Sequence, residues 1–165
     1  MNINIGIGEL LVDRAPNILQ TRGLGSCIGL TLYDETKKIG ALAHIMLPYL
    51  SEFDSTKNIL TQNIKFRYAD YAIPYILNKM TLMGSNVINI KAKIIGGASM
   101  FRRKSSTLNI GEKNITAVKN ILDFSGIKII AEEIGGETGR TVFFDLNHGT
   151  VLIRTYGRNK RDKVI

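Results

Sequence analysis

Short apolar runs separated by glycine and polar turns make up most of this chain, and the first of them, 2–7, places Ile at every second position. This period of two is typical of strands whose two faces differ in burial. Two longer segments, 68–83 and 110–124, instead space their apolar residues by three and four, as helices do. The strand-like runs cover 2–7, 18–21, 27–33, 38–47, 89–95, 128–134, 140–146 and 150–156. Because strands and helices do not alternate regularly, the pattern predicts an α+β fold with mostly antiparallel sheets.

The composition limits the domain organisation and the chemistry. A length of 165 residues with 44% hydrophobic and 22% charged residues predicts one globular domain over 1–165 and excludes disordered, collagen-like and coiled-coil chains. One cysteine cannot form an internal disulfide, and with only two histidines a zinc site would need a carboxylate, so we expect no metal. No apolar run reaches the ~18 to 20 residues that cross a bilayer. With no basic, apolar leader at Met1, we expect a cytoplasmic protein without membrane insertion.

The net charge of +8 predicts an anionic partner or merely a well-solvated surface. The positive charge gathers in Arg102-Arg103-Lys104 and in the last dozen residues of the chain. No zinc finger, RNP-type motif or basic helix accompanies it, so nucleic-acid binding rests on charge alone. We expect no nucleic-acid partner. The alternative, a basic domain that binds nucleic acid, predicts binding that falls steeply with salt and does not depend on Cys27.

The hairpin formed by 27–33 and 38–47 brings the single cysteine to a histidine. With Tyr33 opposite Lys38, one face of the hairpin becomes wholly apolar, and the other face pairs Cys27 with His44. Directly opposed residues have Cβ atoms about 4.5 to 5.5 Å apart, which allows a thiol–imidazole contact. Gly29 and Gly40 would then leave room for a substrate beside the thiol.

A cysteine beside a histidine is a candidate nucleophile and base. The imidazole can take the thiol proton and later protonate a leaving amine, and we expect it to favour the thiolate. The turn Gly25-Ser26-Cys27 could present backbone N–H groups to an oxyanion, and Thr21 or a backbone carbonyl could orient the ring. The residues alone leave a plain alternative open, in which Cys27 is a small buried side chain and His44 a structural histidine.

Around these residues the chain resembles the CheD family of chemoreceptor glutamine deamidases. The resemblance extends in family order over nearly the whole chain, through 24–27, 43–48, 67–70, 96–101, 110–114 and 135–140. It implies a β-sandwich with two helices on one side, in α/β/β layers, similar to the catalytic domain of cytotoxic necrotizing factor. It also implies that Cys27 is the nucleophile, His44 the general base and acid, and Thr21 an orienting residue.

The reaction implied by the resemblance is hydrolysis of receptor glutamine to glutamate through a thioester, without a cofactor. Glutamate methyl esters would be possible second substrates. The implied partners are the cytoplasmic helices of chemotaxis receptors and the phosphatase CheC. Met100, Phe101 and Arg102 combine apolar anchors with a basic rim and are the predicted partner-binding residues. The alternative is a non-catalytic regulatory module that binds CheC or receptors.

Overall fold

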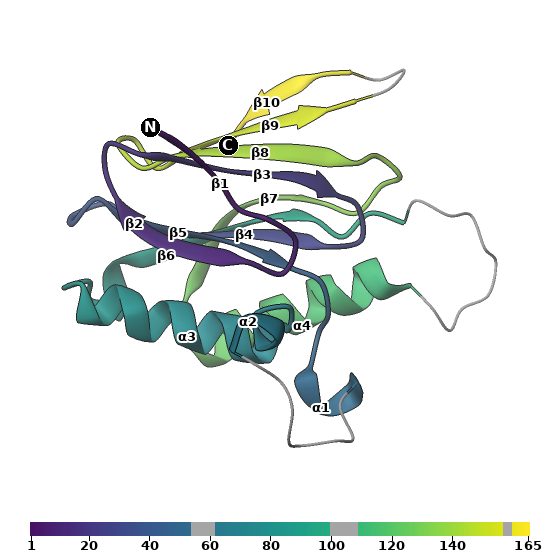
Figure 1. Cartoon of the computed structure of the whole chain (residues 1–165), viewed down its shortest axis with the longest axis horizontal. Coiled ribbons are helices and arrows are strands. Elements are labelled where there is room, and N and C mark those ends of the chain that lie inside the picture. The colour runs from purple at the N-terminus through teal and green to yellow at the C-terminus, as the bar shows by residue number, and fades with distance from the viewer. Residues whose placement is uncertain (54–61, 100–108, 157–159) are drawn as a thin grey trace.

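The structure, a computed structural model, describes residues 1–53, 62–99, 109–156 and 160–165, and it consists of two stacked five-stranded sheets with helices on one side (Figure 1). One sheet has the order β1-β3-β8-β9-β10, with the bounds Asn2–Asn4, Ile18–Leu24, Arg140–Asp145, Thr150–Thr155 and Asp162–Val164. The other has the order β2-β5-β4-β6-β7, with the bounds Leu10–Arg14, Ile39–Ile45, Ile28–Asp34, Ile90–Gly96 and Lys128–Ile134. Strand pairs are antiparallel except β1–β3 and β6–β7.

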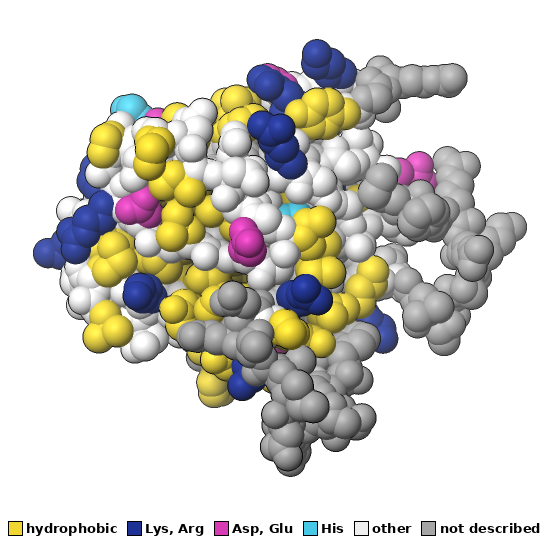
Figure 2. Space-filling view, in the orientation of Figure 1, with side chains coloured by type: hydrophobic (Ala, Val, Ile, Leu, Met, Phe, Trp, Pro, Cys, Tyr) yellow, Lys and Arg dark blue, Asp and Glu magenta, His cyan; other side chains and the backbone are white. Residues whose placement is uncertain are grey.

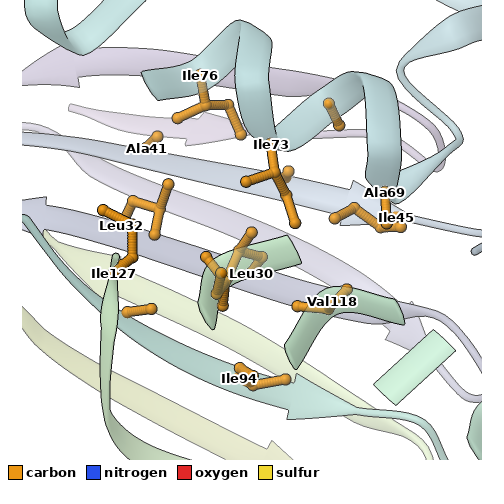
Figure 3. Close-up of a cluster of buried hydrophobic side chains, with 14 of the residues drawn as sticks. Leu30, Leu32, Ala41, Ile45, Ala69, Ile73, Ile76, Ile94, Val118 and Ile127 are labelled. Carbon is orange, nitrogen blue, oxygen red and sulfur yellow. The ribbon is translucent and has the colours of Figure 1, made fainter. Parts of the chain in front are cut away.

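The two long helices pack on the outer face of the sheet that contains β4 and β5. They are α3 (Ala69–Leu82) and α4 (Ile110–Phe124), and the short elements are α1 (Leu50–Phe53), α2 (Gln62–Lys65) and the 3-10 turn η1 (Val87–Asn89). Figure 3 shows Ile73 and Ile76 of α3 lying over Leu30 and Ala41 of the sheet. None of the described helices is long and apolar enough to cross a membrane.

Two hydrophobic clusters hold the three layers together. One lies between the helices and the sheet and takes alternate residues of β4, such as Leu30 and Leu32. The other lies between the two sheets and includes Leu24, Leu42 and Phe144. Both faces of β4 and β5 are therefore buried, which explains why these strands read as nearly continuous apolar runs.

The predicted α+β class, the two helices and the two-sheet arrangement are confirmed, whereas two strands were missed. The segment of β2, Leu10–Arg14, begins with three consecutive apolar residues and carries no alternation. The segment of β10, Asp162–Val164, is short and exposed, and basic residues precede it. Both segments are strands because they pair with neighbouring strands, β2 with β5 and β10 with β9, and the local sequence does not predict this pairing.

The predicted hairpin register is wrong by two residues. Tyr33 lies opposite Gly40 rather than Lys38, and His44 lies opposite Gly29 rather than Cys27. Asp34 belongs to the strand and its carboxylate accepts hydrogen bonds from the backbone N–H groups of Thr36 and Lys37, which closes the turn one residue later. A shift of two residues leaves each side chain on its face, so the apolar pattern could not distinguish the two registers.

Candidate active site

The region around Cys27 is built where the ends of several elements meet. Cys27 ends the bend that joins β3 to β4, and it packs half-buried against the cluster between the sheets. The segment that follows β6 holds this bend in place, because Gly97 N–H donates to Cys27 O at 2.9 Å and Ala98 N–H donates to Gly25 O at 2.8 Å. The nucleophile candidate is therefore fixed by backbone contacts.

His44 near the end of β5 is fully buried and contacts Thr21 of β3 in the other sheet. The Thr21 hydroxyl donates to Ile5 O at 2.8 Å, so its oxygen must accept a hydrogen bond from His44 Nδ1, 2.7 Å away. This arrangement requires a proton on Nδ1 and leaves the lone pair on Nε2. Nε2 is buried and has no hydrogen-bond partner in the described part of the chain. The ring is held in the tautomer that can accept a proton at Nε2.

The corrected register makes His44 a diagonal neighbour of Cys27. His44 faces Gly29 across the hairpin, and Cys27 lies two residues before Gly29. Diagonal neighbours on one face lie about 7 to 8 Å apart, with their Cβ atoms somewhat closer, still within reach of aromatic and long side chains. No hydrogen bond joins the thiol to the imidazole in this conformation, because Nε2 is without a partner among the described residues.

Burial disfavours the charged forms of both groups, contrary to the expected preference for a thiolate. It lowers the pKa of His44 to about 4 and raises the pKa of the Cys27 thiol, against a smaller lowering by the residue's own N–H. Burial thus favours a neutral thiol beside a neutral imidazole in this conformation.

The two glycines expected to leave room for a substrate do not do so. A Cβ added at Gly29 would lie 2.7 Å from the Leu24 side chain, and one at Gly40 would lie 2.5 Å from Leu146. These glycines instead admit side chains that fill the core between the sheets. A substrate must therefore approach Cys27 from outside the sandwich.

Backbone donors for an oxyanion are present at the bend itself. Gly25 N–H donates to Gly23 O, whereas neither the Ser26 nor the Cys27 N–H donates to a backbone oxygen of the ranges that the structure describes. Adjacent N–H groups of this kind can stabilise a developing negative charge on a carbonyl oxygen.

Asn114 of α4 lies in the same region and was not among the predicted residues. Its amide group donates to Ser26 O and to Met46 O, each at 2.9 Å, and the residue is fully buried. The signal in the sequence is a polar residue on the helix face that also carries Ala117 and Val118.

The other predicted site residues are the three proposed to bind a partner. The partner-binding prediction at Met100, Phe101 and Arg102 falls on 100–108, outside the described residues. Within the described ranges no three His, Cys, Asp or Glu side chains gather as metal ligands would.

The positive charge near the C-terminus is partly paired with carboxylates, and Lys and Arg side chains are scattered over the face shown in Figure 2. These ion pairs are Arg154–Asp162, Arg161–Glu133 and Lys163–Glu133.

The burial of neutral His44 predicts a pH dependence of stability. The unfolded chain takes up a proton near pH 6.5, whereas folded His44 does so only near pH 4, so acid favours unfolding across this window. The free energy of unfolding should fall by roughly 3 kcal/mol from pH 7 to pH 4, measured by urea denaturation. His44→Gln should remove most of the fall between pH 7 and pH 5, where carboxylates with a lowered pKa contribute little, and His148→Gln should keep it. Equal slopes in the two variants would contradict the assignment.

Comparisons with known proteins agree with the resemblance in the sequence. The sequence model of the family described as CheD chemotactic sensory transduction matches residues 46–155. A protein of Clostridium novyi is 48% identical over 161 residues, which are 96% of each chain, and one of Clostridium kluyveri is 45% identical over 157 residues, 94% of this chain and 93% of its own. Both are named probable chemoreceptor glutamine deamidase CheD. The chain therefore belongs to the CheD family.

Proposed function

We propose that this protein is a chemoreceptor glutamine deamidase that hydrolyses receptor glutamine side chains to glutamate and releases ammonia. The observation that carries the proposal is the buried His44 ring, oriented by Thr21 with its Nε2 lone pair free, on the strand next to β4, which begins directly after Cys27. A buried basic nitrogen without a partner has a cost in stability that a purely structural histidine would avoid. The names of relatives more than 40% identical over nearly the whole chain support the same activity.

In the proposed reaction His44 acts first as a base and then as an acid. Nε2 takes the thiol proton as Cys27 Sγ attacks the carboxamide carbon, and the Ser26 and Cys27 N–H groups face the oxyanion. His44 returns the proton to the departing nitrogen, so ammonia leaves and a thioester remains. Water then loses a proton to Nε2 and attacks the thioester carbon. The C–S bond breaks, glutamate leaves, and Nε2 returns the proton to the sulfur, which restores the thiol. Glutamate methyl esters fit the same acyl chemistry.

The setting of this reaction is also part of the proposal. The substrate would be a cytoplasmic receptor helix, and CheC would be a second partner that docks on Met100, Phe101 and Arg102. The two-sheet sandwich with helices on one side supports a likeness to the catalytic domain of cytotoxic necrotizing factor. A purely regulatory module that only binds CheC or receptors would have no use for the Thr21–His44 arrangement.

Mass spectrometry of a receptor cytoplasmic fragment tests the activity. Incubation with the protein should raise the mass of specific glutamine peptides by ~1 Da, and by ~3 Da in water labelled with oxygen-18, because water supplies the new oxygen. Iodoacetamide gives a specific control, since Cys27 is the only cysteine of the chain. Conversion by the alkylated protein, or no conversion by the untreated protein, would overturn the proposal.

A further inference from the structure

Asn114 connects the two backbone segments that carry the candidate dyad. One amide hydrogen of its side chain goes to Ser26 O, directly before Cys27, and the other goes to Met46 O, two residues after His44. Both acceptors are carbonyls, so only the NH2 group of Asn114 can serve them. The carboxamide thus joins the bend before β4 to the end of β5 from the side of the helix layer.

The helix that carries Asn114 is seated directly on the backbone behind Cys27. A Cβ added at Gly111, one turn before Asn114, would lie 2.6 Å from Gly97 O and 2.9 Å from Ala98 O. Gly97 in turn donates its N–H to Cys27 O. Only glycine permits this approach, and the approach brings the Asn114 side chain between the two segments.

The other half of the Asn114 carboxamide is left without a partner. Oδ1 is buried and accepts no hydrogen bond in the described part of the chain. Structures rarely retain a buried polar atom in this state when an apolar side chain would fill the space. The free-energy cost of burying Oδ1 without a hydrogen bond is offset only by the two hydrogen bonds that the NH2 group of Asn114 donates.

We propose that Asn114 is a positioning residue that holds the Cys27 bend at a fixed place relative to His44. This inference rests on the proposed function for its catalytic consequence, whereas the placement of the thiol can be measured without any substrate. With the NH2 group removed, the bend loses its side-chain tie to the segment after β5 and keeps only its backbone contacts, so we expect the thiol to gain contact with water. Deamidation should then become slower while Cys27 becomes easier to modify.

Asn114→Ala provides the test, with Leu122→Ala as the matched control. Leu122 is a fully buried residue of the same helix, about 12 Å further along its axis, and its truncation destabilises the fold without touching Ser26 or Met46. If Asn114→Ala does not fold, Asn114→Ser, which keeps one donor, replaces it. Each variant is measured at a temperature well below its unfolding transition.

Two readouts decide the matter. We expect Asn114→Ala to lower kcat for deamidation about tenfold or more with KM little changed, and to raise the rate of iodoacetamide labelling at pH 7 several-fold. Its labelling profile should move to lower pH, because the thiol is less buried. Leu122→Ala should change neither. A labelling profile that coincides with the unchanged protein, or with Leu122→Ala, would overturn the role of Asn114. If the unchanged protein deamidates nothing, the proposed function fails, and the labelling profile alone decides on Asn114.

Discussion

Replacing Cys27 by alanine is expected to abolish deamidation of a receptor fragment, with a loss of at least ~1,000-fold in kcat. The chain has no second thiol, so no neighbouring nucleophile can form the acyl intermediate. The variant should fold, because Cys27 is only half-buried at the edge of the cluster between the sheets. Conversion is measured as the ~1 Da gain of glutamine peptides against time.

Cys27→Ser provides a sharper form of the same experiment. Serine has nearly the same shape, but its hydroxyl gives up a proton far less readily than a thiol, and a His44 ring with a pKa of about 4 is a weak base for it. We therefore expect Cys27→Ser to be almost as inactive as Cys27→Ala. Activity within tenfold of the unchanged protein in either variant would rule out the thioester route.

The layered fold could be predicted because the local pattern and the packing agree. Leu30 and Leu32 alternate with residues that face the second sheet, and the segment predicted as a helix over 110–124 is α4 with the same bounds. The register of the β4–β5 hairpin could not be predicted from these patterns. It depends on Asp34, whose carboxylate closes the turn, and a shift of two residues leaves the apolar faces unchanged.

The candidate site shows a similar division between what the sequence predicts and what packing decides. Cys27 and His44 could be singled out from residue types and strand positions, whereas only the family resemblance chose Thr21 over a backbone carbonyl, and the structure joins Thr21 to His44 directly. The protonation of the pair could not be predicted, because it comes from burial by both sheets, which reverses the expected preference for a thiolate. The contacts of Asn114 could not be predicted either, because their partners Ser26 and Met46 lie 88 and 68 residues earlier in the sequence.

Replacing His44 by glutamine is expected to lower kcat by about 100- to 10,000-fold and leave KM within a few-fold of its value. The side-chain amide of glutamine can still bond to Thr21, but it cannot take the thiol proton. Because the neutral Cys27–His44 pair must transfer its proton during the attack, the loss falls on the chemical step and not on receptor binding.

The second histidine of the chain supplies the matched control for this experiment. His148 is exposed in the turn after β8, where its ring bonds to Asp145, so His148→Gln should keep the full rate. The unchanged protein should also retain its rate down to about pH 5, because His44 stays neutral until near pH 4. Equal losses in the two glutamine variants would remove His44 from the role of base. A rate of the unchanged protein that falls with a midpoint near pH 6.5 would instead contradict the lowered pKa of His44, because an imidazole held neutral by burial does not titrate there.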